Sequence, residues 1–132
     1  MSKPIAEIST AALAYLGDSI IEVCVREMLV ECGISSAKNL NAASLDFVKA
    51  DSQAEAMAKI IPHLPEEENM AFRRGKNIGH ANVPKSSTPE QYRTATGMEA
   101  LFGYLHLTGK VARIKELFAI AYEEKINKLQ EK

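Results

Sequence analysis

The most informative part of this chain for its fold is the stretch Leu13-Ala14-Tyr15-Leu16-Gly17-Asp18-Ser19. It lies inside a segment that predicts a long first helix, with Ser9 or Thr10 as the N-cap and an end near Glu31, before Gly33. Apolar residues cover an unusually broad part of the surface of this helix, so we expect the helix to be mostly buried.

Asp18 stands on an apolar face of that predicted helix. At about 100° per residue, its neighbours on the face are small or apolar side chains, with Glu22 as the polar exception. An unpaired charge is costly to bury, so Asp18 needs a strong partner: a cation, a metal ion or a set of hydrogen-bond donors. The alternative is an ordinary inward-facing aspartate that accepts hydrogen bonds or pairs with a basic side chain.

A second carboxylate, Glu99, is predicted to face inward from a helix that begins near Thr88. At the same angular spacing, its neighbours are again small or apolar, and they include Ala95 and Phe102. The sequence therefore predicts two acids in places where acids are usually avoided.

Glycine stands beside each of these acids: Gly17 precedes Asp18, and Gly97 and Gly103 flank Glu99. A glycine inside a helix costs about 1 kcal/mol relative to alanine, and close approach of two helices best explains its presence. If the two helices cross at their glycines, the carboxylates meet, and such a pair needs a cation between them. A site made of oxygen ligands predicts Mg²⁺, with Mn²⁺ as a substitute.

The rest of the chain also favours helices, because Ala, Leu, Glu, Lys and Met are frequent and no hairpin signal occurs. We therefore predict an all-α fold in a single domain that spans residues 1–132. The further helices expected are one or two between Asn39 and Ile61 with a break near residues 50–52, one from Pro65 to Arg74, one from Pro89 to Leu107 with Thr88 and Gln91 in a capping box, and one from Val111 onward.

Residues 75–88 predict a long basic loop between two of these helices. The chain is nearly neutral, with a net charge of −1, yet no acidic residue occurs from Asn69 to Pro89. The cations of this region are Arg73, Arg74, Lys76 and Lys85. They predict a surface that binds a polyanion, and the alternative is an ordinary solvated loop.

Composition argues against several classes of protein. No run of about 18 apolar residues occurs, and the N-terminus lacks the apolar core of a signal peptide, so we expect a cytoplasmic protein without membrane contact. Two cysteines and three histidines without ligand spacing leave little from which to build a zinc site. We also expect no nucleotide cofactor.

Two segments resemble the ribonuclease III family. Leu13–Ser19 is similar to the signature helix of that family, whose core is Leu-Gly-Asp after an aromatic residue, and Gly97-Met98-Glu99-Ala100-Leu101-Phe102-Gly103 is similar to its second acidic helix. Shorter matches resemble the Mini-ribonuclease III subgroup: Arg73-Arg74-Gly75-Lys76-Asn77, Val83-Pro84-Lys85, Tyr92-Arg93 and Thr96-Gly97. The motifs occur in the order that the family has.

The resemblance implies a ribonuclease III-type helical endonuclease that cleaves double-stranded RNA, requires Mg²⁺, forms a homodimer and takes part in maturation of the large-subunit ribosomal RNA. It implies that Asp18 and Glu99 are the catalytic and metal-binding residues. The separate RNA-binding domain of full-length members is expected to be absent, so the nuclease domain itself must bind RNA. The residues expected to do so are Arg73, Arg74, Lys76, Asn77, Lys85 and Thr96.

The chain departs from full-length members of that family at two positions, which carry acids there and are Ala14 and Thr96 here. The implied metal site is therefore poorer in charge, and Asp51 and Glu55 are the candidates for a further acidic ligand. The alternative functions are a catalytically silent RNA-binding or ribosome-associated protein with the same fold, and a purely structural helical module. A silent protein would have no reason to keep two carboxylates on apolar faces.

Overall fold

The computed structural model describes residues 3–78 and 87–131. In order along the chain, its elements are η1 (Ile5–Glu7), α1 (Thr10–Glu31), α2 (Ala37–Val48), α3 (Ala50–Ile60), η2 (Ile61–His63), α4 (Glu66–Lys76), α5 (Pro89–Leu107) and α6 (Val111–Gln130). No strand occurs among these described residues, so the predicted all-α fold is confirmed.

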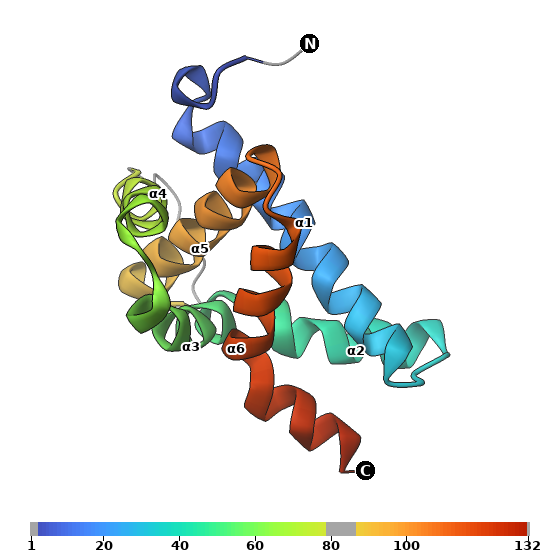
Figure 1. Cartoon of the computed structure of the whole chain (residues 1–132). Coiled ribbons are helices and arrows are strands. Elements are labelled where there is room, and N and C mark those ends of the chain that lie inside the picture. The colour runs from blue at the N-terminus through green and yellow to red at the C-terminus, as the bar shows by residue number, and fades with distance from the viewer. Residues whose placement is uncertain (1–2, 79–86, 132) are drawn as a thin grey trace.

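Helix α5 is the centre of the fold (Figure 1). Helices α1, α3, α4 and α6 all pack against it, while α2 packs against α1 and α3. The α5 side chains that are completely buried are Met98, Ala100, Leu101, Phe102 and Leu105. Because Glu99 lies in the middle of this run, its backbone is held firmly by the surrounding helices.

Side-chain caps fix where the two central helices begin. The Ser9 hydroxyl oxygen accepts a hydrogen bond of 3.0 Å from the backbone N–H of Ala12 at the start of α1. At the start of α5, Thr88 and Gln91 form the predicted capping box, with hydrogen bonds of 3.0 and 3.1 Å. These caps set the register of both helices, and therefore the direction in which Asp18 and Glu99 point.

The other helices differ slightly from the predicted boundaries. Helix α2 begins at Ala37 rather than near Asn39, because Ser36 acts as its N-cap. The break between α2 and α3 is at Lys49, whose backbone is extended (φ −62°, ψ 150°), one residue before the predicted break.

Helix α4 is longer than predicted and shortens the basic loop. Pro65 lies just outside the helix as its N-cap, and the helix continues beyond Arg74 to Lys76. Gly75, which the sequence pattern assigns to the loop, is instead buried in α4, where an added Cβ would lie 2.5 Å from the Cβ of Ala100. This glycine therefore allows α4 to lie close to α5.

The predicted close approach of α1 and α5 is confirmed. A Cβ on Gly17 would lie 1.6 Å from the backbone oxygen of Glu99, and one on Gly103 would lie 2.0 Å from the backbone oxygen of Leu13. Gly97 serves a different contact, because it faces Phe72 of α4 at 2.7 Å. It is six residues before Gly103 and so points about 120° away around the helix.

Long-range polar contacts attach α6 to the other helices. Arg113 donates to both carboxylate oxygens of the buried Glu68 in α4, at 2.9 to 3.2 Å, and to the backbone oxygen of His63 at 2.9 Å. The Tyr122 hydroxyl donates to the backbone oxygen of Phe47 at 2.9 Å. Among the described residues, no helix has both the length and the apolar character to cross a lipid bilayer.

Candidate functional site

The two predicted carboxylates meet where α1 and α5 cross. The carboxyl groups of Asp18 and Glu99 interact both through charge and through a hydrogen bond. They share an open cleft of about 280 Å³ that is lined by Ala11, Ala14, Tyr15, Asp18, Ile78, Tyr92, Thr96 and Glu99. The glycine contact at Gly17 holds the backbone of α1 against that of Glu99, so the helix crossing itself brings the acids together.

Glu99 is in an environment that disfavours its charge. Burial, followed by the nearby charge of Asp18 and the hydrogen bond to it, raises the pKa of Glu99 from an ordinary value of 4.5 to about 8. This shift favours the protonated form of Glu99 in the free protein. A carboxylate pair of this kind releases that proton readily when a cation binds.

The expectation that Asp18 faces the interior is wrong, because its side chain is exposed. Gly17, Ile21 and Val25 occupy the buried stripe of α1, and Asp18 lies at the edge of this stripe. The cost of burying a charge therefore falls on Glu99 rather than on Asp18. Asp18 instead has the access to solvent that a ligand for an incoming molecule needs.

Five residues of the cleft were absent from the predicted site: Ala11, Ala14, Tyr15, Ile78 and Tyr92. The ring of Tyr15 is 84% exposed although the residue is aromatic. The signal for Tyr92 was helical spacing, since it precedes Thr96 by four residues and Glu99 by seven, which places all three on one side of α5. Ile78 follows α4 and gave no signal in the sequence.

Thr96 lines the cleft, but its hydroxyl already has a partner. The side chain is buried, and the hydroxyl donates a 3.0 Å hydrogen bond to the backbone oxygen of Tyr92 in the preceding turn. Thr96 therefore shapes the wall beside Glu99, and its oxygen lone pairs remain the group that it offers to a ligand.

The predicted RNA-binding cations are grouped at the end of α4. Arg73 and Arg74 are exposed, Lys76 is half-buried, and Asn77 is the exposed C-cap residue. Since Ile78 lines the cleft, this end of α4 lies beside the carboxylate pair. Lys85 lies outside the described residues.

The structure does not bring the two further acidic candidates to the cleft. Asp51 accepts a 2.8 Å hydrogen bond from the backbone N–H of Ser52 at the start of α3. Glu55 lines a different cavity, between α3 and α6, together with Lys59. Within residues 3–78 and 87–131, no three His, Cys, Asp or Glu side chains are close enough to hold one metal ion.

The raised pKa of Glu99 predicts how pH affects stability. The folded-state pKa of about 8 is above the ordinary 4.5, so protonated Glu99 stabilises the folded protein below 4.5 and this contribution is lost as pH rises toward 8. Glutamine imitates the protonated form. In buffer without divalent cations, Glu99→Gln is thus expected to raise the melting temperature above that of the wild type at about pH 8.5 and to change it little at about pH 4. Parallel pH profiles for the two proteins would contradict this prediction.

Comparison with known proteins agrees with the motifs and with the fold. The ribonuclease III domain matches residues 11–110. The Mini-ribonuclease 3 of Symbiobacterium thermophilum is 41% identical over 83% of this chain and 84% of that protein, and the Mini-ribonuclease 3 of Enterococcus faecalis is 37% identical over 84% and 86%. A crystal structure of a Fusobacterium nucleatum protein superimposes with a TM-score of 0.83 at 34% identity, covering 94% of this chain and 99% of that one. The chain therefore belongs to the ribonuclease III family of endoribonucleases, in its Mini-ribonuclease 3 group.

Proposed function

We propose that this endoribonuclease cleaves double-stranded RNA with Mg²⁺ held by Asp18 and Glu99, and that its substrate is the precursor of the large-subunit ribosomal RNA. The observation that carries the proposal is the carboxylate pair at the crossing of α1 and α5, in an open cleft beside a cationic helix end. The identity of the RNA rests on the family resemblance.

The residues of the cleft fit a magnesium ion. Magnesium in nucleic-acid enzymes is often held by one or two carboxylates, with water and substrate phosphate completing its shell. Asp18 and Glu99 supply two carboxylates, and the raised pKa of Glu99 indicates that the pair lacks a compensating positive charge. The oxygen-only ligand set also admits Mn²⁺.

The protein contributes to cleavage mainly by positioning. A metal ion bound here supplies a more acidic attacking water and neutralises charge on the phosphate. Glu99 is fixed by the backbone contact with Gly17, whereas the side chain of Asp18 is exposed to solvent. Arg73, Arg74 and Lys76 bind neighbouring phosphates and so orient the duplex. Because A-form RNA hides its base edges in a deep narrow groove, recognition rests on shape, phosphates and 2′-hydroxyl groups.

The test of this function uses long duplex RNA with and without Mg²⁺. Cleavage is expected only when the ion is present, and a single-stranded RNA of the same sequence serves as the control substrate. Binding without cleavage in the presence of Mg²⁺ or Mn²⁺ would instead support the catalytically silent alternative. Failure to bind the duplex would contradict both proposals.

We also propose that the enzyme works as a homodimer, as its family resemblance implies. Light scattering at concentrations that give full cleavage is expected to report a dimer, and a monomer under those conditions would refute this part of the proposal.

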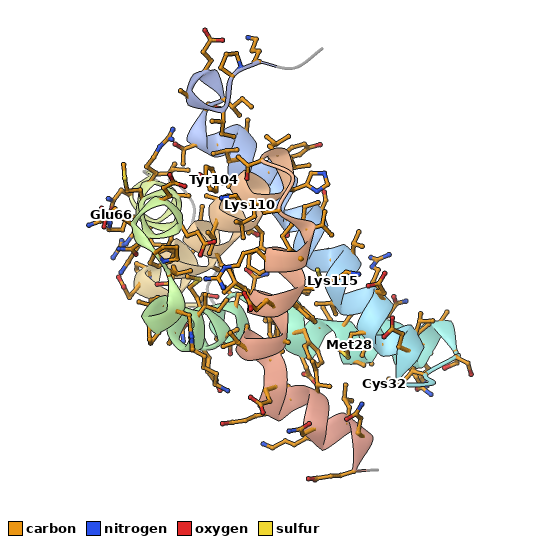
Figure 2. All side chains as sticks on the ribbon, viewed as in Figure 1. Met28, Cys32, Glu66, Tyr104, Lys110 and Lys115 are labelled. Atoms are coloured by element: carbon orange, nitrogen blue, oxygen red, sulfur yellow. The ribbon has the colours of Figure 1, made fainter. Side chains whose placement is uncertain are left out.

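Removal of the exposed arginines of α4 should weaken binding uniformly across RNA sequences. For Arg73→Ala and Arg74→Ala, the plot of log affinity against log salt concentration is expected to flatten by about 0.9 for each phosphate contact that the substitution removes, the value for B-form DNA. The preferred cleavage position should change little, because phosphate contacts position a duplex without reading its sequence. Lys115→Ala is the control, since Lys115 lies on the side of α6 away from α4 (Figure 2). Equal slopes for the arginine and control variants would show that RNA binds elsewhere.

A further inference from the structure

Glu90, in the first turn of α5, holds two of the cations beside the cleft. The Lys76 Nζ atom lies 2.8 Å from Oε1 of Glu90, and the Arg93 Nη2 atom lies 3.2 Å from Oε2. Each carboxylate oxygen thus takes a different cation, one from the end of α4 and one from the next turn of α5. These hydrogen bonds to Lys76 and Arg93 lower the pKa of Glu90, so the group is a carboxylate at neutral pH.

The two cations lie next to residues of the cleft. Lys76 is two residues before Ile78, and Arg93 follows Tyr92 directly and lies one turn before Thr96. Residues three apart on a helix are surface neighbours, so Arg93 lies beside the wall formed by Thr96. Both cations therefore belong to the segments that form the cleft, each within one helical turn of a residue that lines it.

The ion pairs of Glu90 are easily exchanged. Its side chain is 60% exposed, and those of Lys76 and Arg93 are 34% and 45% exposed. Ion pairs in contact with solvent contribute little to stability. The contact between α4 and α5 does not depend on them, because Gly75 of α4 already lies against Gly97 and Ala100 of α5.

The ion pairs of Glu90 in α5 differ from the ion pair of Glu66 in α4. Glu66 also pairs with a cation, Arg73, at 3.4 Å, but both residues belong to α4, and Glu66 lies on the side of that helix away from α6 (Figure 2). Glu90 instead joins α4 to α5 and occupies two cations at once.

We propose that Glu90 competes with RNA phosphates for Lys76 and Arg93, and that duplex RNA binds by replacing this carboxylate. The inference rests on the proposed duplex-RNA function and adds Arg93 to the residues that bind phosphate. A duplex presents closely spaced phosphates to both cations and can displace the carboxylate from both. A small anion must displace the same carboxylate without the further phosphate contacts that a duplex makes, so Glu90 favours a polyanion over isolated anions.

The test compares duplex binding by the wild type and Glu90→Gln over a range of salt concentrations, in buffer without divalent cations so that no cleavage occurs. Glu90→Gln is expected to bind about 3- to 10-fold more tightly near 0.1 M salt, because two cations are freed and one negative charge is removed. Glu67→Gln, at the exposed start of α4, makes the same change in net charge and should bind as the wild type does.

A double-mutant cycle separates competition from a general charge effect. When Lys76 and Arg93 are both replaced by methionine, adding Glu90→Gln should no longer tighten binding. Affinity for inorganic phosphate, measured by direct titration in the absence of RNA, gives an independent readout and should be higher in Glu90→Gln than in the wild type. If Glu90→Gln is poorly folded by circular dichroism, Glu90→Ala takes its place in the same cycle.

The outcomes distinguish this inference from the proposed function. If the wild type binds duplex RNA and Glu90→Gln binds equally or less tightly, the carboxylate is only a clamp between α4 and α5, and the inference is overturned. An equal gain in Glu67→Gln would overturn it as well. If the wild type does not bind duplex RNA at all, the proposed function fails, and this inference fails with it.

Discussion

Glu99→Gln and Asp18→Asn are each expected to lower the rate of duplex-RNA cleavage by at least about 100-fold while leaving the fold and RNA binding intact. Each change preserves the size of the side chain and removes the negative charge that holds a metal ion. The backbone contact between Glu99 and Gly17 is unaffected, so the helix crossing remains. The measurement is the single-turnover cleavage rate with saturating enzyme and Mg²⁺.

The double variant tests whether the two acids act together. Because both serve one ion, Asp18→Asn combined with Glu99→Gln should lose little more activity than either single variant. Additive losses would mean that the two residues act separately. The matched control is Glu22→Gln. Glu22 lies one turn after Asp18, and its carboxylate pairs with Arg26 at 3.2 Å. This substitution should leave the cleavage rate almost unchanged.

Activity and stability should move in opposite directions at Glu99. The same Glu99→Gln change that abolishes cleavage is expected to stabilise the metal-free protein above neutral pH, because it removes the cost of a buried charge beside Asp18. A merely structural glutamate would lose stability when it is altered. The pair of measurements therefore distinguishes a functional carboxylate from a packing residue.

The second large effect concerns the glycines at the helix crossing. Gly17→Ala is expected to destabilise the protein by more than about 4 kcal/mol or to prevent native folding. The added Cβ would lie 1.6 Å from the backbone oxygen of Glu99, 2.5 Å from its carbonyl carbon and 2.9 Å from the backbone nitrogen of Gly103. All of these are backbone atoms, so no side chain can move aside and the two helices must separate.

Helix propensity alone predicts that Gly17→Ala increases the free energy of unfolding. Alanine inside a helix is favoured over glycine by about 1 kcal/mol, so an isolated α1 would be stabilised. Urea denaturation of Gly17→Ala thus decides whether propensity or tertiary packing prevails. Gly33→Ala is the control, because no heavy atom lies within 4 Å of the Cβ that would be added there. Gly33 has a φ of +91°, so this variant should lose only the modest free energy that a left-handed backbone conformation costs an alanine. Stability of Gly17→Ala equal to that of the wild type would contradict the proposed role of the crossing.

Patterns of neighbouring residues predicted the helix caps and the approach of Asp18 to Glu99. The caps at Ser9 and Thr88 involve residues only three positions apart, so their hydrogen bonds can be predicted from adjacent residues. The glycines at 17 and 103 have no better explanation than a close helix contact, which is why the sequence alone predicts that Asp18 and Glu99 meet. The motifs around these residues were sufficient to identify the family.

The element that covers each helix face depends on the tertiary packing, which the periodicity of a helix does not reveal. Periodicity places a residue on a face of its own helix, but the burial of that residue depends on elements that are distant in sequence. Asp18 is exposed because α5 covers Gly17 beside it, and Gly75 is packed rather than part of a loop because α4 lies against α5. The pairing of Glu90 with Lys76 joins residues from two helices, and no spacing rule along the chain predicts such a contact. The charge balance beside the cleft therefore follows from how the helices pack, since packing fixes which charges lie within reach of one another.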